Sequence, residues 1–164
     1  MSHPFDVLSI PSRPGQLIFT PCPGTKDSSI ASALATLKQA GAEALLTLMP
    51  TAELELNGAS ELPALCAELG LAWLQLPVAD EQVPLADFDA AWEQAREQIR
   101  ELLADGRSIA IHCKGGSGRT GLIAARILID QGIARSEAIS LVQALRPKAI
   151  QHPAHAGWIA QFDA

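Results

Sequence analysis

The chain has 164 residues, of which 48% are hydrophobic and 18% charged, and this composition argues against an intrinsically disordered protein. Its length corresponds to one average domain, so we expect a single domain over residues 1–164, with residues 1–15 as an irregular segment. The formal net charge is −6 at pH 7, and the basic residues form no large cluster. Nucleic acids and anionic membrane surfaces are therefore not expected as partners, because both require basic patches.

Cysteine usage points to a reducing compartment. The three cysteines, at positions 22, 66 and 113, are odd in number and widely spaced, which favours neither a disulfide framework nor a zinc site. We expect Cys22 and Cys66 to be core residues, and we expect no metal. The N-terminus has no apolar signal segment, and the longest apolar run, residues 122–129, is too short to span a membrane. These features predict a cytoplasmic protein.

Strands and helices alternate along the chain. Short apolar runs predict strands at residues 16–20, 44–48, 71–76 and 108–111. Helical spacing and capping residues predict helices at 27–40, 60–70, 87–104, 118–131 and 136–145, and a last one beginning at His152 or Ala154. The alternation indicates an α/β fold, with a small, largely parallel central sheet flanked by helices on both faces.

The most informative segment is His-Cys-Lys-Gly-Gly-Ser-Gly-Arg-Thr-Gly at residues 112–121. It follows a buried strand and opens a helix that is apolar on nearly every side. The N–H groups and dipole at such a helix start attract an anion, and the glycines allow the backbone to approach it closely. The segment therefore predicts a phosphate-sized anion site.

Cys113 and Arg119 distinguish this loop from a generic glycine-rich turn. A free cysteine has a pKa of roughly 8.5, and helix N-termini and nearby cations lower that value, which favours the nucleophilic thiolate. The planar guanidinium of an arginine matches two phosphate oxygens at once. A nucleophilic sulfur beside an oxyanion cradle is suited to phosphoryl transfer onto sulfur.

These residues resemble a known family. Cys-x5-Arg-Thr after a histidine is the signature of the cysteine-dependent protein tyrosine phosphatases and dual-specificity phosphatases. Residues 76–80 with Pro84, and the stretches 21–27 and 149–151, resemble the branch of the cyclin-dependent kinase inhibitor 3 phosphatases. The resemblance covers about residues 16–160 and implies a protein-tyrosine-phosphatase-like fold. It also implies a protein phosphatase for phosphotyrosine, extending to phosphoserine and phosphothreonine, without a cofactor.

The resemblance also assigns roles to single residues. Cys113 would be the nucleophile that forms a cysteinyl-phosphate, Arg119 would clamp the phosphate oxygens, and Asp80 would be the general acid and then the base. Thr120 would donate its hydroxyl to the sulfur, and Gln151 would position the attacking water. The expected phosphate cradle and its brace comprise Lys114, Gly115, Gly116, Ser117, Gly118 and Arg119, with His112 supporting the loop.

Several alternatives remain open. Asp87 and Asp89 rival Asp80 as the acid, although both are also typical of the first turn of a helix. Lys114 raises the possibility of a phosphoinositide phosphatase, and a catalytically weak phosphate-binding interaction module is the non-enzymatic alternative. A nucleotide-binding loop is not expected, because the segment ends in Gly-Arg-Thr rather than Gly-Lys-Ser/Thr.

Overall fold

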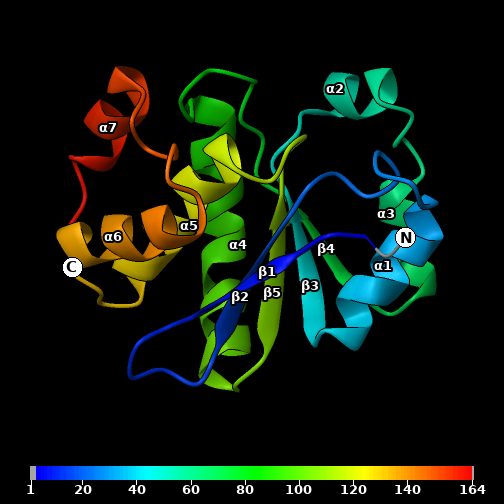
Figure 1. The fold of residues 1–164 in the computed structure, drawn as a ribbon, viewed down its shortest axis with the longest axis horizontal. Coiled ribbons are helices and arrows are strands. Elements are labelled where there is room, and N and C mark those ends of the chain that lie inside the picture. The colour runs from blue at the N-terminus through cyan, green and yellow to red at the C-terminus, as the bar shows by residue number, and fades with distance from the viewer. Residues whose placement is uncertain (1–2, 164) are drawn as a thin grey trace.

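A computed structural model describes residues 3–163 (Figure 1). Its centre is a five-stranded sheet in the order β1-β2-β5-β3-β4, in which β1 is antiparallel to β2 and all other pairs are parallel. The strands are β1 (Asp6–Ser9), β2 (Gln16–Thr20), β3 (Ala42–Thr47), β4 (Ala72–Gln75) and β5 (Ser108–His112). The expected small, largely parallel sheet of an α/β fold is confirmed.

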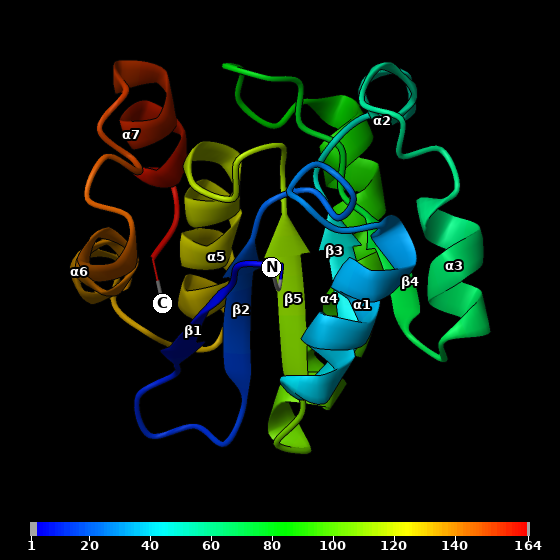
Figure 2. The same cartoon turned by 45° about the vertical axis from the view of Figure 1, so that its right-hand side comes forward.

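Helices cover both faces of this sheet (Figures 1 and 2). They are α1 (Ile30–Gln39), α2 (Thr51–Leu56), α3 (Leu62–Glu68), α4 (Ala86–Ala104), α5 (Gly118–Asp130), α6 (Arg135–Leu145) and α7 (Pro153–Ile159). On one face α1 and α3 bury Leu37 and Cys66 against Ile18 and Leu45. On the other, α4 and α5 form the larger core with the opposite sides of the same strands, and α6 and α7 pack outside α5.

The sheet places three polar side chains in one row. β5 lies between β2 and β3, and in both pairings His112 is the last residue in register, opposite Thr20 on one side and Thr47 on the other. All three residues are buried. Because these strands are parallel, their carboxyl ends share one edge of the sheet, which is where α/β proteins bind ligands.

Two short elements differ from the sequence-based expectations. Residues 1–15 are not an irregular segment throughout, because Asp6–Ser9 pairs with β2 and buries Leu8. Helix α2 follows Pro50, has no side-chain cap and buries only Leu54, so it carries no periodic apolar pattern. Both elements depend on contacts with distant parts of the chain. Within residues 3–163, no helix is long and apolar enough to cross a membrane.

Candidate active site

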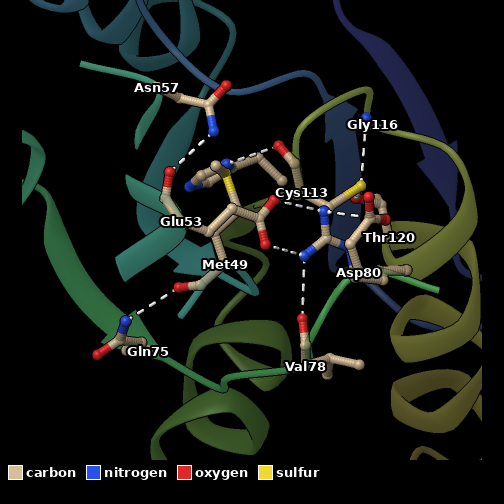
Figure 3. Close-up of polar contacts among 11 residues, drawn as sticks. Met49, Glu53, Asn57, Gln75, Val78, Asp80, Cys113, Gly116 and Thr120 are labelled. Carbon is tan, nitrogen blue, oxygen red and sulfur yellow. Dashed lines mark hydrogen bonds and ion pairs between the residues drawn. The ribbon is translucent and has the colours of Figure 1, made fainter. Parts of the chain in front are cut away.

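Cys113 lies at the carboxyl edge of the sheet, directly after β5 (Figure 3). Its Sγ accepts hydrogen bonds from the Gly116 amide at 3.3 Å and from the Thr120 hydroxyl at 3.2 Å. The sulfur is nearly buried, at the base of an open cavity of about 380 Å³ that the glycine-rich loop and Asp80 help to line. Both donors point at the one sulfur, so its position and direction in the loop are fixed by the Gly116 backbone and the Thr120 side chain.

The loop is held from outside through its carbonyl groups. The carbonyls of Cys113, Lys114 and Gly116 accept hydrogen bonds from His112 Nδ1, Cys22 N and Arg146 Nε, each at 3.0 Å. In a trans peptide the next N–H points away from the carbonyl, so the amides of Lys114, Gly115 and Ser117 point away from these anchors, toward the interior of the loop. Together with the first amides of α5 they form a cradle of donors of the kind that suits an oxyanion.

Gly116 is required by the path of the loop. Its φ is +78°, in the left-handed region, and a Cβ at this position would lie 2.6 Å from the backbone carbon and oxygen of Thr20. Any other residue would push the loop away from β2 and carry the Gly116 amide away from the Cys113 sulfur. The glycine thus serves the close approach of two backbones as well as the turn.

Arg119 is held in place by a carboxylate that sequence reasoning missed. Its Nη1 and Nη2 each lie 2.7 Å from an oxygen of Glu53 on α2, and Nη1 also donates to the Val78 carbonyl at 2.9 Å (Figure 3). Burial opposes the charged form, but the hydrogen bonds and charge of Glu53, together with the charges of Cys113 and Asp80, raise the pKa of the guanidinium. Glu53 binds the end of the guanidinium formed by Nη1 and Nη2, whereas Nε donates to no residue in the described part of the chain. Nothing in the pattern of residues 51–56 distinguishes Glu53 from Glu55.

Of the three candidate acids, the structure brings only Asp80 to the loop. Its Oδ1 lies 3.5 Å from Arg119 Nη2, its side chain is 69% exposed, and it lines the cavity above Cys113. Asp87 and Asp89 lie in the first turn of α4, where Asp87 accepts a hydrogen bond from the Phe88 amide. Both fit their alternative interpretation as residues of a helix start.

The other expected site residues divide into two groups. In the first group, Lys114, Gly115, Ser117 and Gly118 line the cavity above Cys113. The structure does not bring Gln151 to the sulfur, because its side chain is directed to the Pro147 carbonyl. His155 of α7 is buried and contacts the Gln82 carbonyl at 3.0 Å, which connects α7 to the segment after Asp80.

His112 is a buried neutral brace of the loop. Its Nε2 lies 2.8 Å from Thr47 Oγ1, which in turn accepts a hydrogen bond from Trp73 Nε1 at 2.7 Å. Since Nδ1 faces the Cys113 carbonyl, we assign the ring proton to Nδ1 and make Nε2 the acceptor of the Thr47 hydroxyl. Burial, aided by the charge of Arg119, lowers the pKa of His112 to about 4, although the hydrogen bond to the carbonyl opposes this shift.

This shift predicts an acid-sensitive stability. Below its ordinary pKa of 6.5 the His112 ring binds a proton in the unfolded chain, whereas in the folded protein it stays neutral down to about pH 4. The stability it contributes is therefore complete above pH 6.5 and falls as the pH drops, by about 2 kcal/mol between pH 6.5 and 5. We expect H112N, which can still donate to the carbonyl, to flatten this dependence in urea unfolding at several pH values. Parallel pH profiles for the wild type and H112N would contradict it.

Comparisons with known proteins agree with this geometry. A family model described as "Polymorphic toxin system, DSP-PTPase phosphatase" matches residues 23–133. A kinase associated phosphatase (KAP) structure with a serine at its catalytic cysteine superimposes with a TM-score of 0.82 and 24% identity, covering 98% of this chain and 94% of that one. Human DUSP28 gives 0.66 and 20%, covering 98% and 94%. PTPMT1 in complex with PI(5)P gives 0.64 and 16%, covering 88% of each chain.

These structural likenesses, all below 25% identity, show the shared protein-tyrosine-phosphatase-like fold. No curated protein matched the chain. The family model covers well over half of the chain, including the whole of the glycine-rich loop. The chain therefore belongs to the DSP-PTPase phosphatase family, within the cysteine-dependent dual-specificity phosphatases.

Proposed function

We propose that this single domain hydrolyses phosphoproteins, with phosphotyrosine as the main substrate and phosphoserine and phosphothreonine as further ones, through a cysteinyl-phosphate. The observation that carries the proposal is the position of Cys113 Sγ, which accepts hydrogen bonds from the Gly116 amide and Thr120 hydroxyl inside an amide-lined loop that ends at Arg119. The same arrangement, together with Asp80, favours an enzyme over a phosphate-binding module, which needs no nucleophile.

In the first step the Cys113 thiolate attacks phosphorus and the bond from phosphorus to the side-chain oxygen breaks. The Asp80 carboxylic acid gives its proton to the departing oxygen, while Arg119 and the loop amides hold the three other oxygens. Thr120 stabilises the sulfur, which is the leaving group of the second step.

In the second step water attacks the cysteinyl-phosphate and gives its proton to the Asp80 carboxylate. The bond between sulfur and phosphorus breaks, which regenerates the thiolate and releases inorganic phosphate. For Gln151 to hold this water, its amide must exchange the Pro147 carbonyl for the cavity by rotating its side chain. No cofactor or metal takes part in either step. The need for a free thiolate, with all three cysteines unpaired, supports a reducing compartment such as the cytoplasm.

The test is steady-state kinetics with a chelator present, using a nitrophenyl phosphate and phosphotyrosine, phosphothreonine and phosphoserine peptides. We expect the wild type to turn over, with equal rates with and without the chelator. An enzyme that is inactive on every substrate, or whose activity the chelator abolishes, would overturn the proposal. The peptide panel also ranks the three phosphorylated residues.

Asp80→Asn in the same assay identifies the acid. A nitrophenolate departs readily without a proton, whereas a tyrosine phenolate, with a pKa of about 10, needs one. We expect D80N to slow the phosphotyrosine peptide by roughly 100-fold or more and the nitrophenyl ester much less. It should also flatten the limb of the pH–rate profile on which activity falls as pH rises.

Asp87→Asn and Asp89→Asn are the matched controls, because each makes the same change from carboxylate to amide at one of the two rival acids. Neither should show a dependence on the leaving group. If D80N slows both substrates equally while D87N spares the nitrophenyl ester, the acid is Asp87.

A further inference from the structure

Most of the lysine and arginine side chains of this acidic chain have partners within the molecule. Among the described residues every arginine makes an ion pair, a hydrogen bond or a ring contact: Arg13, Arg96, Arg100, Arg107, Arg119, Arg126, Arg135 and Arg146. The ammonium group of Lys38 donates to the Leu69 carbonyl. The ammonium groups that have no hydrogen-bond or ion-pair partner among residues 3–163 are those of Lys26, Lys114 and Lys148.

These three lysines surround the mouth of the site. Lys26 and Lys114 line the cavity that contains Cys113. Lys148 lines an adjoining cavity of about 320 Å³, which shares Asp80, Gly118 and Arg119 with the first. The lysines come from three separate segments, the loops after β2 and β5 and the segment after α6, so their convergence is a product of the fold rather than of one basic stretch.

Charge decides what this arrangement attracts. The protein carries a net charge of −6, so its body as a whole repels a phosphorylated ligand. Exposed ammonium groups with no internal partner can pair with carboxylates or phosphates of a ligand that lies over the cradle. The transferred phosphate itself is held by the loop and Arg119, so the lysines are left for other anionic groups on the same substrate.

The shape of the surface favours a peptide. A third cavity of about 350 Å³, with mostly apolar walls, shares Ser117 and Gly118 with the first cavity and Lys148 with the second. Its lining is completed by Arg146, Pro147 and Ala149. Each of these three contiguous cavities has at least one lysine in its lining, and the walls of the third are mostly apolar. Such a surface suits an extended chain that projects different side chains on either side of the phosphorylated residue.

A membrane surface fits less well. The exposed large hydrophobic side chains of residues 3–163 are Phe5, Val7, Leu56 and Leu85, and none of them lines these cavities. The mouth therefore offers no apolar side chain of this kind for insertion into a bilayer beside a lipid headgroup.

We infer that the substrate is an acidic phosphopeptide segment, with carboxylates or a second phosphate on both sides of the phosphorylated residue. This inference rests on the proposed function and names the sequence context that the same site selects. Lys26 and Lys114 contribute more than Lys148 to the preference for acidic flanks. The reason is that Glu81 lines the same cavity as Lys148 and offsets part of its charge.

The experiment compares two phosphotyrosine peptides of equal length, one with acidic flanks and one in which Gln and Asn replace those acids. For the wild type at low salt we expect kcat/KM to be about fivefold higher for the acidic peptide, and this preference to shrink in high salt. K26Q and K148Q should each lower the ratio, and the double variant should bring it close to one. K38Q, the matched control, should keep the wild-type ratio.

Each result has a defined meaning. A wild-type ratio near one, or a ratio that K26Q and K148Q leave unchanged, overturns the inference. Faster hydrolysis of a phosphoinositide in anionic vesicles than of the acidic peptide also overturns it, because the lysines would then serve a lipid headgroup. If the wild type hydrolyses no phosphate ester, the proposed function fails. The ratio of the peptides' dissociation constants, measured by calorimetry with C113S, still tests the inference.

Discussion

Cys113→Ser is expected to abolish turnover while leaving the protein able to bind oxyanions. A serine hydroxyl is a weak nucleophile at neutral pH, because it stays protonated there. We expect kcat on the nitrophenyl ester to fall by about 1,000-fold or more. The loop amides and Arg119 do not depend on the sulfur, so calorimetry should still detect tungstate or inorganic phosphate binding within about tenfold of the wild-type affinity.

Cys66→Ala is the matched control for this experiment. Cys66 is buried between α3 and the sheet, where burial raises the pKa of its thiol to about 11, so it stays uncharged. Its loss should change stability rather than the turnover of the folded enzyme. Substantial activity in C113S would require a different nucleophile, and loss of oxyanion binding would mean that the sulfur itself holds the cradle open.

Arg119→Lys is the second change with a large expected effect. Lysine keeps the positive charge but loses the planar fork, so it cannot bind Glu53 through two hydrogen bonds while presenting a second edge to the phosphate. We expect kcat/KM to fall by about 1,000-fold, comparable to the loss of a major oxyanion donor. Near-normal kinetics of R119K would show that the charge alone is sufficient.

Glu53→Gln tests the other half of the same contact. The glutamine keeps one acceptor but loses the charge, so Arg119 is oriented by one hydrogen bond from α2 instead of two. We expect a smaller fall in kcat/KM of roughly tenfold. Glu55→Gln removes an exposed carboxylate from the same helix and should leave the kinetics unchanged. Equal effects of E53Q and E55Q would indicate a general influence of charge near the site.

The elements that carry a periodic apolar pattern could be predicted from the sequence. β5 and α5 are buried on nearly every side, so their apolar runs are clear signals, and the loop between them falls where residues 112–118 predict it. β1 and α2 were missed because each buries a single residue along its length, Leu8 and Leu54. Such short segments are stabilised by the partner they pack on, which local patterns do not reveal.

The same division applies to the site. The contact of Thr120 with Cys113 and the approach of Asp80 to Arg119 follow from the motif and its acid loop. The pairing of Arg119 with Glu53 joins residues 66 positions apart, through a helix that the sequence does not predict. Tertiary pairings of this kind have no local signature. The catalytic roles of these residues stay predictions until the variants are measured.

The anchoring of the loop also sets the order in which the cradle can be completed during synthesis. The Cys113 and Lys114 carbonyls find their donors in His112 and Cys22, which leave the ribosome before them. The donor to the Gly116 carbonyl is Arg146, which is synthesised 30 residues later. Arg146 is also paired with Asp6 of β1 at 2.9 Å. A nascent chain that ends before Arg146 lacks the donor that holds the Gly116 carbonyl and thereby orients the Ser117 amide. The loop is therefore fully anchored only after the segment that follows α6 has been made.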